Sequence, residues 1–518
     1  MQSAGCPCCA YQQPLSGPRL FTRATLNWEW ATGESKRKVA VDSGSTRTLL
    51  LDGGTIVDPR DGSTAVNVSV RMRNGRIVEV SPSEAAREDP ATERIDAAGR
   101  FIVPGYNDMH SHALNLADPS ASLALMLAEG VTGFRQMSGS PALLKKRRDN
   151  ALPIGPAAPA LLETPGTVLT PLNSGSSKAV AAEIRRQHDQ GADFVKMVMA
   201  GPDVFMAAVE EAVAVGIPIL GHLQEGVDIV AASQAGFRSV EHLGPGSPLW
   251  AACSTIDEEL RSEGYARPVI KGPPIKIPLL ERIVTWRMQS LLVNPAAFSD
   301  PIDVARIQRA LDSYSADKAA AVAAELAKHG TWQVPTLVRL RSMQYAGAPE
   351  YESDESMAYL PAKNIKRWRT VTTKFLALPA EAQKTYRDLY PRQLSLAKLF
   401  ADNGVRMMTG TDGGSMMAPG LTLRQEFAEL AKAGISPLKI LQMTTINPAQ
   451  YLGREDTMGT VEPGRNADLV VLDANPLDDV ENLHRINAVV RAGTHYSAAQ
   501  LAALKVRVKA SVDVTQTL

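Results

Sequence analysis

Two histidines one residue apart, His110 and His112, are the residues whose types and spacing are best suited to chemistry. They end the string Pro-Gly-Tyr-Asn-Asp-Met-His-Ser-His at 104–112, and the apolar run before it predicts a short buried strand. Successive side chains on a strand point to opposite faces, so the two imidazoles point the same way and Ser111 the other way. Two imidazoles side by side can hold one divalent ion when other ligands converge on them. The pair therefore predicts a metal site, provided that further ligands exist.

Four more polar residues stand at the ends of predicted strands: Lys196, His222, His242 and Asp412. Each has an ordinary alternative, because a histidine is often a core or surface residue, a lysine can reach solvent, and an aspartate after Gly-Thr often forms a turn. The joint pattern favours chemistry, since half of the eight histidines stand at strand ends. The other four are predicted to be structural or exposed: His188, His329, His484 and His495.

Strands and helices alternate along 104–455, which predicts an α/β fold with a (β/α)8 TIM barrel. Enzymes with this fold keep catalytic groups at the C-terminal ends of the strands. Short strands and turns fill 48–103, including a hairpin signal at Asn74-Gly75, and similar strands return in 456–518 before a C-terminal helix. Two stretches exceed the minimal alternation and are expected to form lid-like insertions, near 249–315 and 342–368.

Composition narrows the class of protein. Apolar residues make up 44% and charged residues 21% of the 518 residues, which is ordinary for a globular enzyme. Lys plus Arg and Asp plus Glu number 55 each, so no excess charge favours nucleic acid or a membrane surface, and a small-molecule substrate is expected instead. Four cysteines do not make a disulfide framework in a chain of this length, which favours a cytoplasmic location. Residues 1–47 lack clear periodicity and are expected to be a poorly ordered extension.

Several segments resemble the amidohydrolase superfamily over about 49–490. The string at 104–112 resembles its first-strand signature, and 191–197 is similar to the fourth-strand segment of its binuclear members, in which the lysine is carboxylated. Segments 221–223 and 239–244 look like its fifth- and sixth-strand histidines, and 408–413 like its eighth-strand aspartate. The chain looks most similar to imidazolonepropionase-like and barrel-type prolidase members.

This resemblance implies an amidohydrolase that cleaves an amide C–N bond of a small molecule. It implies two divalent metal ions, with Zn²⁺ expected, bridged by carboxylated Lys196, and a small β-sandwich domain built from both ends of the chain around the barrel. A metal-activated bridging hydroxide would attack, with Asp412 as general base and acid beside His242, and Asp108 would orient the His-x-His segment. A homo-oligomer is also expected from the family. The implied metal ligands are His110, His112, Lys196, His222, His242 and Asp412.

Other functions stay open. His222-Leu223-Gln224-Glu225 resembles the fifth-strand signature of mononuclear deaminases. The alternative function is therefore a mononuclear deaminase or cyclic-amide hydrolase that uses Glu225. In the structural interpretation, Glu225 is only a residue in the first turn of a helix, where the helix dipole favours a negative charge. A lactone or organophosphate hydrolase could use the same ligands, and a scaffold without catalysis is the alternative outside enzymes. The segment 200–203 is shorter than the Gly-rich loop usual in barrel-type prolidases, which argues against transferring dipeptidase specificity.

Substrate-binding residues can be suggested from residue type alone. Arg135 or Arg339 could pair with a substrate carboxylate. Aromatic and thioether side chains in the two insertions and near Asp412 could line an apolar pocket: Trp286, Tyr345, Tyr351, Met416 and Met417.

Overall fold

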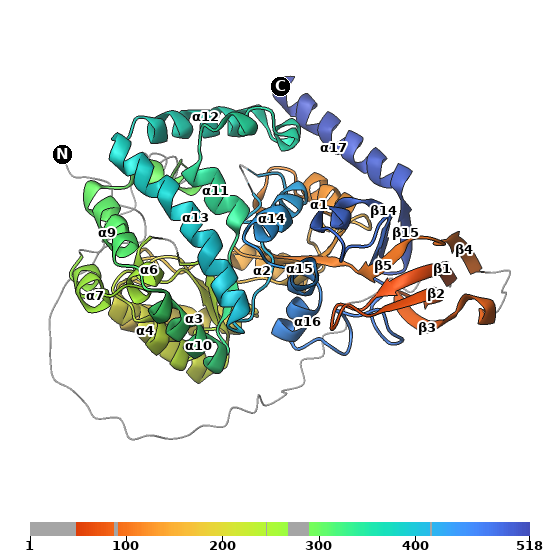
Figure 1. Cartoon of the computed structure of the whole chain (residues 1–518), viewed down its shortest axis with the longest axis horizontal. Helices are drawn as coiled ribbons and strands as arrows, with labels where there is room; N and C mark the ends of the chain where they lie inside the picture. The colour runs from red at the N-terminus through yellow and green to blue at the C-terminus, as the bar shows by residue number, and fades with distance from the viewer. Residues whose placement is uncertain (1–47, 87–91, 245, 268–289, 415–416, 518) are drawn as a thin grey trace.

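The computed structural model describes residues 48–86, 92–244, 246–267, 290–414 and 417–517. The predictions for 1–47, Trp286 and Met416 lie outside these residues. In Figure 1 the strands from the beginning of the described chain and those near its C-terminus lie together at one end of the molecule, and the helices surround the remaining strands. Within the described residues, no helix has the length and apolar character needed to cross a membrane.

An eight-stranded mixed sheet combines strands from both ends of the chain. Its order is β15-β14-β13-β5-β1-β2-β3, with β4 paired to β1, and β13 lies antiparallel to β5 with Val470 opposite Val103. Asn74 and Gly75 have positive φ angles of 52° and 72°, which confirms the predicted tight hairpin between β2 and β3. The strands are β1 (Thr48–Val57), β2 (Thr64–Arg73), β3 (Arg76–Pro82), β4 (Thr92–Asp96), β5 (Phe101–Pro104), β13 (Leu469–Leu472), β14 (Ile486–Arg491) and β15 (Thr494–Ser497).

Two parallel sheets position the predicted site. One has the order β6-β7-β8 and the other β12-β11-β10-β9. Three isolated parallel β-bridges connect the two sheets: Leu169 with Met197, Gln333 with Met407, and Ser111 with Gly413. The first connects the segment after β8 to β9, and the other two connect β12 and β6 through the 405–413 segment. The strands are β6 (Tyr106–Ser111), β7 (Val131–Gln136), β8 (Ala160–Glu163), β9 (Val195–Met197), β10 (Ile219–Gly221), β11 (Ser239–Glu241) and β12 (Trp332–Val334).

The predicted eighth strand at 405–412 is not a regular strand. Met407 makes one bridge, but the Thr409 N–H donates to Met443 O and the Asp412 N–H donates to His110 O at 2.8 Å. Asp412 itself has a φ of 53°, which is incompatible with extended backbone. The segment therefore leaves the ladder early and turns Asp412 back toward β6.

Helices separate the strands, and their ends carry the expected signals. In α10 the Ser315 side chain accepts the Lys318 N–H, and Gly330 ends the helix in the left-handed conformation. The helices are α1 (Pro119–Ala128), α2 (Pro141–Arg148), α3 (Ser177–Asp189), α4 (Pro202–Val215), α5 (Ile229–Gln234), α6 (Pro248–Ala252), α7 (Asp257–Tyr265), α9 (Pro301–Asp312), α10 (Ala316–His329), α11 (Leu337–Gln344), α12 (Ala362–Leu376), α13 (Ala380–Asp402), α14 (Leu421–Lys432), α15 (Pro437–Thr444), α16 (Ile446–Leu452) and α17 (Ala498–Thr517).

The insertions are mainly helical where the structure describes them. Helices α6, α7 and α9 follow β11, and α11 and α12 follow β12 with two 3-10 turns, Pro349–Tyr351 and Glu355–Tyr359, between them. In Figure 1, α12 lies across one side of the molecule above α11 and α13, and the C-terminal helix α17 lies beside α1. The first insertion comes after His242, which directly follows β11, whereas the second follows β12, which carries none of the predicted ligands.

Candidate metal centre

The six predicted ligands come from five separate segments. His110 is in β6 and His112 follows it, Lys196 is in β9, His222 follows β10, His242 follows β11, and Asp412 lies in the 405–413 segment. Parallel neighbours end at the same edge of a sheet, so these positions bring the side chains to one place.

The side chains meet in one cluster. His112 Nε2 lies 3.0 Å and His110 Nε2 3.4 Å from Asp412 Oδ1. One ligand atom from each of these three residues lies within 4.8 Å of the others. Lys196 Nζ is 3.1 Å from His110 Nε2. The His242 ring centroid is 4.5 Å from that of His110 and 5.2 Å from that of His222, so a chain of short contacts links all six.

Unusual backbone conformations aim two of these side chains. His242 has a φ of 60° and Asp412 a φ of 53°, in the left-handed region. This conformation costs about 1–2 kcal/mol for a residue with a side chain, and it persists where the surroundings enforce it. The His242 N–H donates to Val334 O at 2.9 Å, and the Asp412 N–H is held by His110 O. Strain of this kind is characteristic of functional sites.

Hydrogen bonds fix three of the four imidazoles through Nδ1. His112 Nδ1 lies 2.7 Å from Ser138 Oγ, and His242 Nδ1 lies 2.7 Å from Thr336 Oγ1. His110 Nδ1 lies 2.6 Å from a Glu241 carboxylate oxygen. In each case Nε2 remains for another partner, which is how metal-binding histidines are usually held.

His222 is different. Its Nδ1 is buried and has no hydrogen-bond partner within the described part of the chain. A buried imidazole nitrogen without a partner costs free energy unless a ligand occupies it. An unpartnered nitrogen on a histidine of the cluster fits a cation bound there.

Glu241 connects the cluster to a buried arginine. Its Oε1 accepts from Arg135 Nη2 at 3.0 Å and from Ser239 Oγ at 2.9 Å, while Oε2 faces His110. All three side chains of the Arg135–Glu241–His110 chain are fully buried. Burial raises the pKa of Glu241, but Arg135 and His110 outweigh it and hold the pKa at about 2. An ionised Glu241 accepts the Nδ1 proton of His110, which leaves Nε2 with its lone pair toward Lys196 and Asp412.

The suggestion that Arg135 binds a substrate carboxylate is wrong. Its Nε donates to Met109 O at 2.7 Å, and its guanidinium lies 5.0 Å from the Tyr451 ring centroid, with the whole side chain inaccessible. The residue from this region that the sequence reasoning missed is Glu241. A charged residue inside a three-residue buried strand was the signal that could have found it.

The protonation states suit metal ligands. Burial lowers the pKa of His112 to about 4 and that of His222 to about 3, and burial also lowers the pKa of His242 well below its usual range. Burial lowers the pKa of Lys196 to about 8. Burial raises the pKa of Asp412, but the neighbouring His110 and His112 imidazoles reverse this and keep the pKa well below its usual range. Neutral imidazoles and an ionised carboxylate are the forms that bind cations.

Asp108 holds the His-x-His segment in place through hydrogen bonds to backbone and side-chain groups. It accepts the His110 N–H at 3.0 Å, the Thr411 N–H at 3.2 Å and the Thr411 hydroxyl at 2.7 Å. It thus ties β6 to the segment that carries Asp412. Burial raises its pKa to about 6.

Glu225 does not stand in the first turn of a helix, because α5 begins at Ile229. It is buried, and its carboxylate lies 2.8 Å from Arg306 Nη2 and accepts the Ser247 N–H and hydroxyl at 3.0 Å and 2.7 Å. These contacts join the loop after β10 to α9 of the insertion. The carboxylate is occupied in a structural role.

Arg339 pairs with the candidate ligand Asp412. Its Nε donates to Asp412 Oδ2 at 3.0 Å, Nη1 donates to Val293 O at 2.8 Å, and Nη2 donates to Leu292 O. The guanidinium is therefore a partner of the cluster rather than a free cation for a substrate.

The four histidines predicted to be structural lie away from the cluster. His188 and His329 are on α3 and α10, and His495 is on β15. His484 stacks on Phe427 with ring centroids 5.5 Å apart, and burial lowers its pKa to about 3.

The fold and the cluster together indicate a class of protein: an α/β protein in which parallel strands position imidazoles, a lysine and a carboxylate at one buried centre. Imidazole nitrogen with carboxylate oxygen is the donor set that binds Zn²⁺ and similar divalent ions. Residues 296–495 match the model of the amidohydrolase family.

Known proteins resemble most of the chain. The adenine deaminase of Rubrobacter xylanophilus is 23% identical over 469 residues, and the imidazolonepropionase of Fusobacterium nucleatum subsp. nucleatum is 23% identical over 423 residues, covering 79% of this chain and 87% of that protein. A solved bottromycin amidohydrolase is 22% identical, with a TM-score of 0.64 and 90% of each chain covered, and shares the fold. The chain is thus similar to proteins of the amidohydrolase superfamily in sequence and in fold.

The extent of the matches differs between relatives. The match to the adenine deaminase covers 86% of this chain but 56% of that protein. A dihydroorotase of Geobacter sp. (strain M21) is 29% identical over 216 residues, which are 39% of this chain and 49% of that protein. The chain thus spans about half the length of these two relatives.

Proposed function

We propose that this protein is a metal-dependent hydrolase that cleaves an amide C–N bond of a small molecule. The observation that carries the proposal is the convergence of His110, His112, Lys196, His222, His242 and Asp412 on one buried centre. The names of the relatives, deaminase, imidazolonepropionase and amidohydrolase, support chemistry at a C–N bond.

We infer that the two parallel sheets belong to one (β/α)8 barrel, flanked by a β-sandwich domain from 48–103 and 456–518. The three bridges at Leu169, Gln333 and Ser111 support closure, because they link the segment after β8 to β9, β12 to the 405–413 segment, and that segment to β6. The shared fold with the bottromycin amidohydrolase supports it as well. The cluster then lies at the C-terminal ends of the strands, where such barrels hold their sites.

The donor set fits two divalent ions, with Zn²⁺ preferred. His110, His112 and Asp412 would hold one, His222 and His242 the other, and a carbamate on Lys196 both. When bound, such ions polarise a carbonyl and lower the pKa of water toward about 7. Two features of Lys196 support carbamate formation: it makes no ion pair in the described regions, and an amine with a pKa of about 8 is partly neutral near pH 7. Its nitrogen would attack CO₂, forming an N–C bond and releasing one proton.

Asp412 is the residue that would accept the proton of the attacking water and return one to the leaving amine. Its low pKa keeps it ionised before reaction, and Arg339 holds Oδ2 in place. His242, oriented by Thr336, would stand beside the reacting carbonyl. These groups supply base, acid and orientation without further side chains.

The measurement that tests this is the metal-to-protein ratio by elemental mass spectrometry, followed by hydrolysis of a panel of small amides. A ratio near two, with activity lost on chelation and restored by Zn²⁺, is expected. A ratio near one would favour the mononuclear alternative. No bound metal after addition of Zn²⁺ and bicarbonate would refute the proposal. Light scattering during gel filtration checks the expected homo-oligomer.

A further inference from the structure

Helix α11 begins at the candidate metal centre. Thr336 comes directly before its first residue, and Thr336 Oγ1 lies 2.7 Å from His242 Nδ1. Arg339, the third residue of the helix, donates from Nε to Asp412 Oδ2 at 3.0 Å. His242 and Asp412 belong to different ions in the proposed centre. The start of one helix therefore contacts a ligand of each ion.

This helix start lacks the usual cap from its own N-terminal residue. A threonine in the N-cap position commonly accepts a backbone N–H of the first turn with its side chain. The Thr336 side chain accepts none, because its hydroxyl faces His242, and its φ of 46° is one that a β-branched residue rarely adopts. The Thr336 carbonyl accepts the Arg339 N–H at 2.9 Å, so the helix begins here, but the N–H groups of Leu337 and Val338 need another acceptor.

Glu426 of α14 supplies that acceptor. Its Oε2 accepts the Val338 N–H at 2.8 Å. Burial raises the pKa of Glu426 to about 8, and hydrogen bonds from the N–H groups of Val338 and Leu337 act in the opposite direction. The side chain is fully buried, and its Oε1 has no hydrogen-bond partner among the described residues. Within that part of the chain, this carboxyl group is engaged at the start of α11.

The later part of α11 is fixed by the second insertion and by α13. Arg341 Nη1 donates to the Tyr351 hydroxyl at 3.1 Å, and Tyr351 packs on Trp368 of α12 with ring centroids 6.3 Å apart. Tyr345, suggested from the sequence as a pocket residue, follows the helix and packs on Tyr390 of α13 with ring centroids 5.7 Å apart. These contacts hold the C-terminal part of α11, whereas Glu426 holds its first residues.

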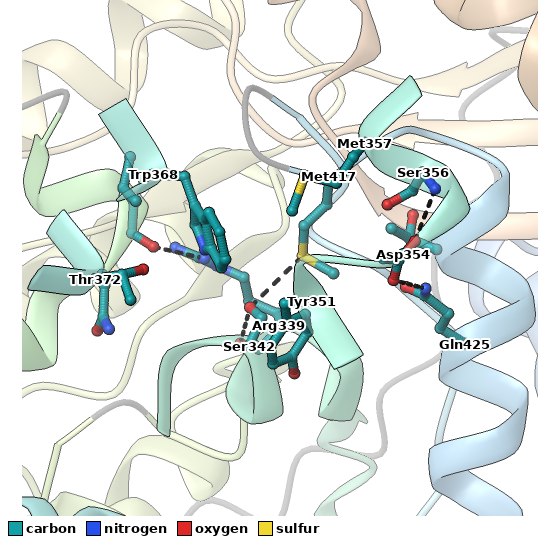
Figure 2. A pocket seen from close by; sticks show the side chains of 13 residues that line it. Arg339, Ser342, Tyr351, Asp354, Ser356, Met357, Trp368, Thr372, Met417 and Gln425 are labelled. Carbon is teal, nitrogen blue, oxygen red and sulfur yellow. Dashed lines mark hydrogen bonds between the residues drawn. The ribbon is translucent and has the colours of Figure 1, made fainter. Parts of the chain in front are cut away.

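The side of α11 that carries Arg339 is not fully packed. Figure 2 shows Arg339 and Ser342 beside Tyr351 and Trp368, around a hollow that Met417 also lines. Its volume of about 30 Å³ leaves room for water but not for a substrate group. Because a gap on this side gives Arg339 less support from packing, hydrogen bonds at the start of α11 contribute more to its position.

We propose that Glu426 is a positioning residue of the metal centre: by capping α11 it fixes Thr336 and Arg339, and through them His242 and Asp412. The inference rests on the proposed function, because it takes the cluster as a metal centre. It adds that a buried carboxyl group outside the ligand set controls a ligand of each ion at the same time.

The test replaces Glu426 by residues of similar size that differ as acceptors. Glu426→Met has no oxygen, so the Val338 N–H loses its partner, and Zn²⁺ affinity measured at pH 7 by competition with a fluorescent chelator should fall about tenfold. Glu426→Gln keeps an oxygen that can accept the same hydrogen bond and should retain most of the affinity. Methionine also fills the buried space, which guards against a folding defect.

Ser315→Ala is the matched control for the loss of a helix cap. Ser315 caps α10 by accepting the Lys318 N–H at 3.3 Å, and α10 carries none of the candidate ligands. The substitution should lower the melting temperature but leave the Zn²⁺ affinity unchanged.

A combined variant tests the route through α11. Thr336→Val removes the hydroxyl beside His242, and Arg339→Met removes the donor to Asp412. With both substitutions present, Glu426→Met should weaken Zn²⁺ binding further by about twofold or less, because residues that act through shared contacts are not additive.

The outcomes are distinguishable. Three results overturn the inference and leave the metal centre intact: unchanged Zn²⁺ affinity in Glu426→Met, an equal loss in Glu426→Gln, or a full tenfold loss in the combined variant. Failure of the wild-type protein to bind Zn²⁺ overturns the proposed function and the inference with it.

Discussion

Glu241→Gln is the substitution that tests the organisation of the centre most directly. The change keeps the shape of the side chain but removes the charge between Arg135 and His110, which lie 3.0 Å and 2.6 Å from its oxygens. Arg135 would become a buried cation without its carboxylate. Breaking a buried ion pair in this way costs about 3–5 kcal/mol.

A second effect concerns metal affinity. An ionised Glu241 holds the proton of His110 on Nδ1, whereas a glutamine amide can present either its oxygen or its NH₂ group there. Loss of such an outer partner usually weakens metal binding by about 10–100-fold. Zn²⁺ affinity, measured by competition with a fluorescent chelator, should therefore fall by that factor.

The two effects can be separated with a double variant. Arg135→Met added to Glu241→Gln removes the unpaired cation, so the melting temperature should recover most of its loss while the Zn²⁺ affinity stays low. Glu426→Gln is the matched control. Burial raises the pKa of Glu426 to about 8, so its carboxyl group is already largely neutral at pH 7 and the same substitution should cost little.

Two results would refute this reasoning. Unchanged Zn²⁺ affinity in Glu241→Gln would mean that the carboxylate does not orient His110. Full recovery of Zn²⁺ affinity in the double variant would mean that the buried charge of Arg135, and not the lost acceptor, caused the defect. The pH dependence gives a further check: the pKa of Glu241 is lowered to about 2, so its stabilisation is present above about pH 4.5 and is lost as the pH falls toward 2.

Three more predictions follow from the site. Lys196→Ala should lower the metal-to-protein ratio from near two to one or below and abolish hydrolysis, and a ratio that stays at two would exclude a bridging carbamate. Glu225→Gln should lower the melting temperature by breaking the pair with Arg306 but keep measurable hydrolysis; complete loss of hydrolysis in a folded, metal-loaded variant would support the deaminase alternative. The raised pKa of Glu426 stabilises the protein below about pH 4.5, and this contribution disappears as the pH rises through about 8, so Glu426→Gln should flatten the melting temperature between pH 5 and 9.

Spacing along the chain was enough to find the candidate ligands because parallel strands end at a common edge. His222 and His242 follow β10 and β11 directly, as the sequence predicts, whereas Lys196 lies in the middle of β9 rather than at its end. The hairpin at Asn74-Gly75 has an equally local cause, because Asn-Gly favours two consecutive positive φ angles. Signals of this kind need no knowledge of distant residues.

What sequence reasoning missed depends on long-range partners. The sequence near Asp412 is extended in character, but hydrogen bonds to His110 and Met443 decide its backbone, and neither is close in the chain. The roles of Glu241 and Arg135 depend on each other across 106 residues. Glu225 resembles a proton shuttle until Arg306, 81 residues further on (306 − 225), occupies it. Hydrogen bonds and ion pairs between residues that are far apart in the sequence could not be predicted from local sequence patterns.

The pairing of β5 with β13 has a consequence for how the protein is made. Leu469 lies opposite Pro104, so 365 residues (469 − 104) must be synthesised after β5 before its partner exists. At about 5–20 residues per second this takes roughly 20–70 s. During that time one edge of β5 lacks its native strand, and the His-x-His segment that follows it lacks Asp412. An unpaired edge is a template for wrong association, so the nascent chain should depend on chaperones more than the finished protein does.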